Sequence, residues 1–330
     1  RNDMKDQSDR SFAGMPFHPL APRIWHGMTF SVWMRLLARN QFAVSPSRIT
    51  MSLSITGVSV INSTLRLIEE TLNRRRIEAA KPQPPIFIIG HWRTGTTLMH
   101  ELMVLDDRFS YPTTLQVMSP HHFLATSWFT RPIMSLVMPK QRPMDAMALG
   151  VDTPQEDEFA LCNLGLESSY LQWAWPNNKE FPQLLDLDAS GEEHRRRWMA
   201  TLDRFLKHLT VGDPRRFVFK SPTHTARVKT LYEMYPDASI VHIVRDPTDV
   251  IPSTLRTFRR LQFMQGLQLP RFENLEETVF DQFEQLHVLV ERDRELVPAS
   301  QFIDVHYEDL VESPVEAIGR VYELLGLRSF

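Results

Sequence analysis

Short apolar runs alternate with segments of helical periodicity along the chain. Four mostly apolar runs are present, at residues 86–89, 217–219, 240–244 and 302–305. A segment with apolar residues every three or four positions follows each of them, at residues 96–105, 225–235, 250–258 and 314–325. In the first of these segments Leu98, Leu102 and Leu105 are expected to lie on one face of the helix. Apolar runs of this length are typical of strands buried on both faces, so the alternation predicts a three-layer α/β fold with a mostly parallel central sheet.

The pattern also divides the chain. Residues 1–80 show no strong strand signal and are predicted to form a helical segment, which ends in a polar run and the prolines Pro82, Pro84 and Pro85. We expect an α/β domain over residues 81–330, with a helical insertion or lid at about residues 119–210. Because the sequence starts with Arg1 and stops just after the last predicted helix, we expect a fragment that is truncated at its C-terminus.

The amino-acid composition limits the classes of partner that this protein is expected to bind. The 330 residues are 42% hydrophobic, enough for a sizeable core. They carry 37 Lys and Arg against 40 Asp and Glu, a net charge of −3. A nucleic-acid partner held by bulk electrostatics is therefore disfavoured, and any anion site must be local.

Three features bear on location. Cys162 is the single cysteine and cannot form an internal disulfide, which favours the cytoplasm. The apolar stretch at residues 49–65 is interrupted by Ser, Thr and Asn, so we interpret it as a packed helix rather than a membrane span. Residues 28–37 combine Trp33 with Arg35; a helix docked on the core is the favoured interpretation, and contact with a membrane surface is the alternative.

The strongest chemical signal follows the first predicted strand, at residues 90–97, which read GHWRTGTT. Two glycines let the backbone turn tightly. Successive N–H groups at the start of the next helix, with the hydroxyls of Thr96 and Thr97, then converge on an anion. A turn without a ligand is the alternative, but the strand–loop–helix context is complete. We predict a phosphate-binding loop.

This loop departs from the ATP- and GTP-binding pattern G-x-x-x-x-G-K-[ST]. Thr96 occupies the position of the lysine that contacts the β- and γ-phosphates. The positive charge lies instead at Arg93, whose planar guanidinium suits a donor group lying over the loop. The pattern therefore disfavours ordinary nucleoside triphosphate hydrolysis and indicates a different anionic donor.

These residues resemble the 5′-phosphosulfate loop of sulfotransferases that use 3′-phosphoadenosine 5′-phosphosulfate (PAPS). The Arg-x-Gly-Thr-Thr sequence is most similar to bacterial members and to tyrosylprotein sulfotransferases, and the resemblance extends over about residues 85–330. It implies a P-loop-type fold and PAPS as the donor. It also implies that the 5′-phosphosulfate is bound by Arg93, Thr94, Gly95, Thr96 and Thr97.

A second phosphate-binding element is expected after the run at residues 240–244. Arg245 follows that run and Ser253 lies near the start of the next helix. Both positions belong to the carboxyl edge of the predicted sheet, where open α/β sheets bind ligands. Sulfotransferases contact the 3′-phosphate with an Arg and a Ser at this spacing, so the resemblance implies this role for Arg245 and Ser253.

Lys220 ends the run at residues 217–219, at the same edge. A lysine in this position can extend into solvent. Alternatively, the Lys-x-Pro sequence formed with Pro222 resembles the one in tyrosylprotein sulfotransferases that supplies positive charge at the transferring group. The resemblance makes Lys220 a candidate catalytic residue.

The acceptor needs a general base about 3 Å from its proton. Tyrosylprotein sulfotransferases place a carboxylate after the first helix, but residues 111–114 contain none. The acidic run at residues 156–158 resembles a motif of bacterial members, with Glu156 or Glu158 as base; its alternative is a capping box over residues 153–156. His121 and His122 are a second candidate, although adjacent histidines are more often packed or in loops. No spacing typical of a metal site is present.

Sulfuryl transfer parallels phosphoryl transfer, in which the protein positions the groups and stabilises charge. We expect a PAPS-dependent sulfotransferase without a metal, acting on a hydroxyl or amine of a small molecule, carbohydrate or peptide. Trp128, Phe129, Trp173 and Trp175 either line the acceptor pocket or form ordinary core. Two other functions stay open: a P-loop kinase, which the missing lysine disfavours, and a donor-binding protein without catalysis.

Overall fold

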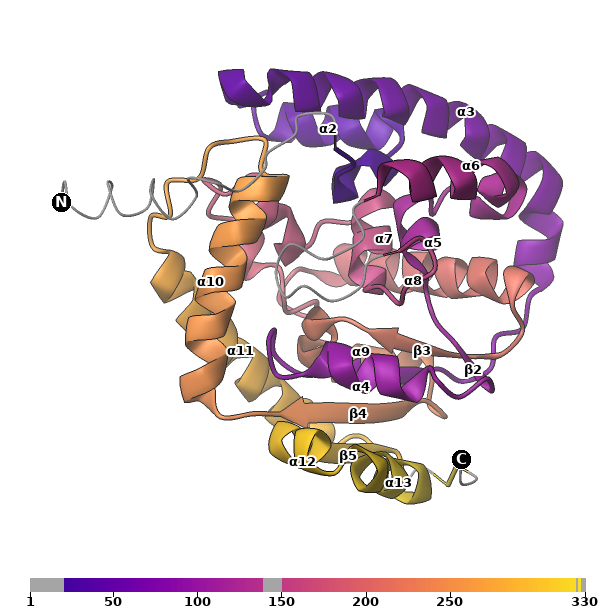
Figure 1. Ribbon diagram of the computed structural model, residues 1–330, viewed down its shortest axis with the longest axis vertical. Coiled ribbons are helices and arrows are strands. Elements are labelled where there is room, and N and C mark those ends of the chain that lie inside the picture. Colours follow the sequence, from indigo (N-terminus) through magenta and orange to yellow (C-terminus); the bar gives the residue numbers. More distant parts are fainter. Residues whose placement is uncertain (1–20, 139–149, 325, 328–330) are drawn as a thin grey trace.

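A five-stranded sheet lies at the centre of the part of the chain that the computed structural model describes, residues 21–138, 150–324 and 326–327. The strand order is β2-β3-β1-β4-β5, and all neighbouring strands are parallel (Figure 1). The strands are β1 (Ile86–Ile89), β2 (Phe109–Ser110), β3 (Arg216–Lys220), β4 (Ser239–Val244) and β5 (Phe302–His306). The predicted α/β class and four of these strands are confirmed. The two-residue β2 is too short to leave a pattern in the sequence.

Helices cover both faces of the sheet, and the side chains of β1 alternate between them. Phe87 and Ile89 join a hydrophobic cluster with Trp198 and Leu202. Those two belong to α8 (Glu192–Gly212), and α9 (Val228–Met234) packs in the same layer. The opposite face is covered by α4 (Thr96–Met103), α12 (Tyr307–Glu312) and α13 (Pro314–Leu324). The last residue of the predicted C-terminal helix, 325, lies outside the described residues.

The predicted leucine face of α4 is only partly buried, with Leu98 and Leu102 packed against the edge of the cluster. Met99 and Met103 are fully buried against the sheet, whereas Leu105 follows the helix and is 78% exposed. The pairs Leu98–Leu102 and Met99–Met103 are both four residues apart, so their periodicity is the same. The tertiary structure buries Met99 and Met103 completely and Leu98 and Leu102 only in part.

A third hydrophobic cluster lies beyond the carboxyl edge of the strands. It contains Trp25, Trp33, Trp173, Trp175 and Phe258. Its elements come from distant parts of the chain: η1 (Ile24–Gly27), α2 (Phe30–Arg39), η3 (Ser169–Trp173), η4 (Phe181–Gln183), α10 (Pro247–Gln265) and α11 (Leu275–Arg294). The cluster joins residues on both sides of the predicted boundary near residue 80, and the division into two domains stays a prediction.

The remaining helical elements are η2 (Pro46–Arg48), α3 (Ile49–Ala79), α5 (Thr114–Met118), α6 (Phe123–Val137), α7 (Asp157–Asn163) and η5 (Pro222–Ala226). The helix α3 extends well past the predicted residue 65 and passes over the top of the molecule in Figure 1. Polar side chains join its inner face to the protein. Asn62 donates hydrogen bonds to the carbonyl oxygens of His26 and Met28, at 2.7 and 2.9 Å. The carboxylate of Glu69 lies 2.9 Å from His208 Nε2.

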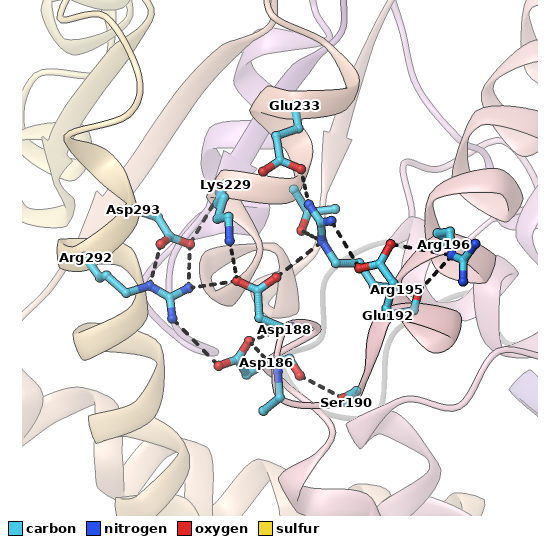
Figure 2. Close-up of polar contacts among 12 residues, drawn as sticks. Asp186, Asp188, Ser190, Glu192, Arg195, Arg196, Lys229, Glu233, Arg292 and Asp293 are labelled. Carbon is cyan, nitrogen blue, oxygen red and sulfur yellow. Dashed lines mark hydrogen bonds and ion pairs between the residues drawn. The ribbon is translucent and has the colours of Figure 1, made fainter.

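A network of ion pairs joins α8, α9 and α11 at the surface (Figure 2). Asp188 accepts a hydrogen bond from Lys229 Nζ at 2.9 Å and lies 3.3 Å from Arg195 Nε. Arg292 bonds to Asp293 at 2.6 Å and reaches toward Asp188. Because most of these groups are partly exposed, each pair contributes less than about 1 kcal/mol. The network mainly orients helices that the core already holds.

Replacement of Asn62 tests whether α3 is held by its polar contacts. The Asn62→Leu variant leaves two carbonyl oxygens without their donors, so we expect the free energy of unfolding to fall by about 2–3 kcal/mol. Urea denaturation measures this. Thr71→Ala, at an exposed position of the same helix, should change stability by less than about 0.5 kcal/mol. Equal stability of the two variants would contradict this role of Asn62.

Candidate active site

The loop between β1 and α4 is strongly curved. Gly90, Arg93 and Gly95 all have positive φ, at 142°, 72° and 101°. A Cβ atom at Gly90 would lie 2.6 Å from the carbonyl oxygen of Ile243, and one at Gly95 would collide with the ring of Tyr307. Only glycine fits these two positions, because both the dihedral angle and the close approach exclude a side chain.

Hydrogen bonds from neighbouring elements fix this loop. The Gly90 N–H donates to Thr225 Oγ1 at 2.8 Å, and Thr254 Oγ1 donates to the carbonyl oxygen of Trp92 at 3.2 Å. The N–H groups of Thr96 and Thr97 begin α4, and first-turn N–H groups have no acceptor within their own helix. They are therefore available to an anion, together with the positive end of the helix dipole.

The second predicted phosphate-binding element meets the first. Arg93 Nε donates to Ser253 Oγ at 3.1 Å, and Arg245 Nη1 donates to the carbonyl oxygen of Arg93 at 3.3 Å. The guanidinium of Arg245 also lies 4.1 Å from the ring centre of Tyr307. Since β1 and β4 are neighbours in the sheet, the residues that follow them meet at one edge. Two residues separated by 152 positions thus lie side by side, and Arg245 also pairs with Asp249 at 3.1 Å.

Lys220 occupies a buried position at the same edge. It ends β3 and pairs in register with Ile88 of β1. Its Nζ lies 2.5 Å from Glu156 Oε1, and Lys220 is only 3% exposed, so it does not extend into solvent. The hydroxyl of Tyr170 donates to the other oxygen of Glu156. Burial, reinforced by the charge of Glu156, raises the pKa of Tyr170 and keeps it protonated.

The other two carboxylates of the acidic run bind the residues that follow Lys220. Asp157 accepts a hydrogen bond from Ser221 Oγ at 2.8 Å and lies 2.7 Å from His224 Nε2. Glu158 accepts two from Arg227, at 2.6 and 3.1 Å. Burial by itself raises the pKa of both carboxyl groups, but His224 and Arg227 outweigh it and hold each pKa below its usual value.

The two predicted base candidates in this run therefore differ in environment. Glu158 is fully buried and bonded to a guanidinium, whereas Glu156 is 8% exposed and contacts Lys220. The alternative capping box over residues 153–156 is wrong, because α7 begins only at Asp157 and the Glu156 side chain makes no cap. The N–H of Gln155 donates instead to the carbonyl oxygen of Pro112, which keeps this segment extended.

The histidine candidates lie in a different setting. His121 Nε2 is 3.0 Å from the carbonyl oxygen of Asn163, and His122 lies between Thr126 and Asn62. Burial is the main cause that lowers their pKa values, to about 3 for His121 and about 4 for His122. Both side chains pack between helices, and a proton would bind them poorly at neutral pH.

The aromatic residues of the middle segment divide into two groups. Trp173 and Trp175 are buried at 1% and 0% exposure, in the core. Trp128 is 79% exposed on α6. Among residues 21–138, 150–324 and 326–327, no cluster of three or more His, Cys, Asp or Glu side chains is arranged to hold a metal ion.

The sequence did not single out Tyr170, Thr225 or Tyr307 as parts of the site. Tyr307 follows β5 at the carboxyl edge of the sheet, and this position could have identified it as a site residue. Tyr170 belongs to a short 3₁₀ helix that is distant in sequence from every strand end, so no pattern indicates its contact with Glu156.

Comparison with known proteins agrees with this arrangement. A model of the sulfotransferase family matches residues 84–330. The chain belongs to the sulfotransferase family. It is 42% identical to the omega-hydroxy-beta-dihydromenaquinone-9 sulfotransferase Stf3 of Mycobacterium tuberculosis. The alignment of 312 residues covers 94% of this chain and 80% of the relative. The Mycobacterium bovis Stf3 gives the same values.

Solved sulfotransferases share the fold. STF1 from Mycobacterium tuberculosis H37Rv superposes with a TM-score of 0.64 at 18% identity, covering 90% of this chain and 81% of that structure. STF9 from Mycobacterium avium gives 0.59 at 20% identity, covering 92% and 84%. This chain is therefore a sulfotransferase enzyme, and PAPS-dependent transfer is the general reaction of its family.

Removing the charge of Glu158 tests its structural role. In Glu158→Gln the buried Arg227 loses its counter-ion, so we expect the free energy of unfolding at neutral pH to fall by about 3–5 kcal/mol. The carboxyl pKa is depressed in the folded state. Its stabilisation is thus present above the unfolded value of about 4.3 and is lost as pH falls through the lower folded pKa. Urea titrations from pH 7 to pH 3 measure both effects.

In Glu158→Gln the free energy of unfolding should not show the part of its fall at low pH that comes from the Glu158 carboxyl group. Glu78→Gln removes a carboxylate that pairs with Arg74 on the exposed end of α3, and it should change stability little. If Glu158→Gln retains wild-type stability and the same slope against pH, the Glu158–Arg227 pair does not stabilise the fold.

Proposed function

We propose that this sulfotransferase uses PAPS as its donor and transfers the sulfuryl group to a hydroxyl group of a lipid. The contact between the two phosphate-binding elements carries the donor assignment. Arg93 reaches Ser253, and Arg245 reaches the backbone of Arg93, so both elements face one region. A donor with phosphate groups at two separate positions suits such a pair of sites.

The residues present fit that donor. The N–H groups of residues 95–97 and the hydroxyls of Thr96 and Thr97, with Arg93, would hold the 5′-phosphosulfate. Thr94 would support the loop instead, because its N–H and its hydroxyl both donate to the carbonyl oxygen of His91. Arg245 and Ser253 would hold the 3′-phosphate. The Nε atom of Arg245 is buried and has no hydrogen-bond partner within the described part of the chain, and a phosphate oxygen is a suitable acceptor for it. The donor supplies the activated sulfuryl group.

The Lys220–Glu156 pair suits the transfer step. The acceptor hydroxyl oxygen forms the new bond to sulfur as the bond from sulfur to the phosphate oxygen breaks. Glu156 would take the hydroxyl proton, and Lys220 would stabilise the negative charge that develops on the departing oxygen. The ammonium group and the carboxylate are already 2.5 Å apart, so both are positioned before the reaction.

The lipid assignment rests on similarity and on one hollow. The relative at 42% identity is named for a hydroxylated menaquinone derivative, which is a lipid. A hollow of about 460 Å³ lies between the end of α6 and the segment that leads to Glu156, lined among others by Tyr111, Met138 and Pro154. We assign this hollow to the approach of the acceptor. We also propose that the enzyme is located in the cytoplasm.

Calorimetry with 3′,5′-adenosine bisphosphate tests the donor site. Arg245→Ala should weaken binding about 10–100-fold, since a charge-assisted hydrogen bond contributes about 1.5–3 kcal/mol. Arg259→Ala, at an exposed position of α10, should bind like the wild type. Tighter binding of ATP with Mg²⁺, accompanied by ATP turnover, would overturn the assignment in favour of a kinase.

Glu156→Gln tests the base. The amide cannot accept the proton, so we expect transfer to fall about 10²–10⁴-fold. Binding of the bisphosphate should stay within about twofold, because the variant leaves the phosphate-binding residues intact. Radiolabelled sulfate transfer to a hydroxylated isoprenoid quinone measures the first quantity, and calorimetry the second. Undiminished transfer would exclude Glu156 as the base.

A further inference from the structure

The outer face of α3 is apolar along most of the helix. Seven side chains on this face are between 45% and 68% exposed: Ile49, Leu53, Val60, Ile61, Leu67, Ile68 and Leu72. We call this set the α3 stripe. A surface helix normally places charged residues opposite its buried face, and α3 does not. The helix passes over the top of the molecule in Figure 1. The exposed stripe residues and the buried residues lie on opposite sides of the helix.

The stripe is continuous. Its members and three uncharged residues on the same side, Gly57, Thr64 and Thr71, together occupy positions three or four residues apart along the helix. From Ile49 to Leu72 the stripe spans roughly 35 Å at 1.5 Å per residue. This exceeds the scattered exposed apolar residues that an ordinary surface carries.

The buried face of α3, opposite the stripe, holds the helix against the rest of the protein along its length. By length and composition, Pro46–Ala79 is the one segment of the described residues that could cross a membrane. However, Asn62 bonds to two backbone carbonyls, and Glu69 contacts both Asn73 and His208. Extracting α3 into a bilayer would separate these buried polar groups from their partners, at several kcal/mol each. Only the stripe is available to an apolar phase.

The neighbouring helix α6 also carries exposed apolar side chains. The backbone N–H of its residue Ala125 donates to Glu69 of α3 at 2.8 Å, which fixes the two helices side by side. Trp128, Ile133, Leu136 and Val137 of α6 are between 52% and 88% exposed. Exposed tryptophan is typical of surfaces that lie in the headgroup region of a membrane.

Positive charge borders this surface although the chain as a whole carries a net charge of −3. Arg74, Arg75 and Arg76 are exposed and follow Leu72 after one residue, and Arg74 pairs with Glu78. Arg131 is exposed on α6, where it pairs with Asp152. Basic residues beside an apolar helix face complement anionic lipid headgroups, each adding about 1 kcal/mol near such a surface.

We propose that the α3 stripe and the exposed residues of α6 bind the surface of an anionic lipid bilayer, with α3 parallel to the membrane plane. The helix α6 also ends beside the hollow assigned to the acceptor, since Ser135 and Met138 line it. The hollow is also lined by Pro154, two residues before Glu156, so a lipid hydroxyl that enters it from the membrane surface would approach the candidate base. This last step rests on the proposed function, whereas membrane binding itself does not require transfer.

Vesicle flotation tests the proposal on the full chain, without donor or acceptor. Wild type should float with vesicles of phosphatidylcholine and phosphatidylglycerol, and more weakly with phosphatidylcholine alone. Leu53→Glu combined with Leu67→Glu should lower the partition coefficient at least about tenfold, since burying one leucine contributes about 1.5–3 kcal/mol. Phe280→Glu with Val288→Glu, at positions 55% and 56% exposed on α11, adds the same charge and should float like the wild type.

Binding of 3′,5′-adenosine bisphosphate verifies that each variant is folded. If the stripe variant is not folded, the uncharged double variant Leu53→Gln with Leu67→Gln is used in its place. Equal flotation of stripe and control variants overturns the proposal, as does wild type that fails to float. A wild-type dimer that the stripe variant dissociates, without vesicle binding, identifies a second copy as the occupant and likewise overturns it. Retained flotation with no transfer to any hydroxylated lipid would overturn only the acceptor assignment.

Discussion

Three consecutive carboxylates, on Glu156, Asp157 and Glu158, hold the segment that follows β3, and the geometry of the site depends on these contacts. Each one bonds to a different partner between Lys220 and Arg227. All three are removed from solvent, so the charges interact strongly and each would be unfavourable without its partner. The contacts therefore fix the position of η5 relative to α7.

The position of η5 in turn fixes the anion loop. Thr225 of η5 accepts the hydrogen bond from Gly90, the first residue after β1. Displacement of this segment would move the loop as well as Lys220. The loop is restrained from the opposite side by Thr254 of α10, the helix that also carries Ser253. The carboxylates thus connect the donor-binding elements to the candidate base through a few short hydrogen bonds.

Hydrogen bonds of buried polar groups also explain why α3 keeps an apolar outer surface exposed to solvent. Its inner face is held by hydrogen bonds whose partners lie on η1, α6 and α8. These directional contacts specify which side of the helix faces the protein, although both sides carry apolar residues. A purely hydrophobic interface would allow the helix to rotate and bury its stripe.

The sequence determined the parallel α/β sheet, since four apolar runs are each followed by a helix. It also located Arg93, Lys220, Arg245 and Ser253 at strand ends or helix starts, and the ends of parallel strands meet at one edge. It could not decide between Leu98–Leu102 and Met99–Met103 as the buried side of α4, because both pairs have the same periodicity. Nor did it distinguish Glu156 from Glu158, or connect Tyr170 to either. Those distinctions depend on burial and on contacts between residues far apart in the chain, which only the tertiary structure decides.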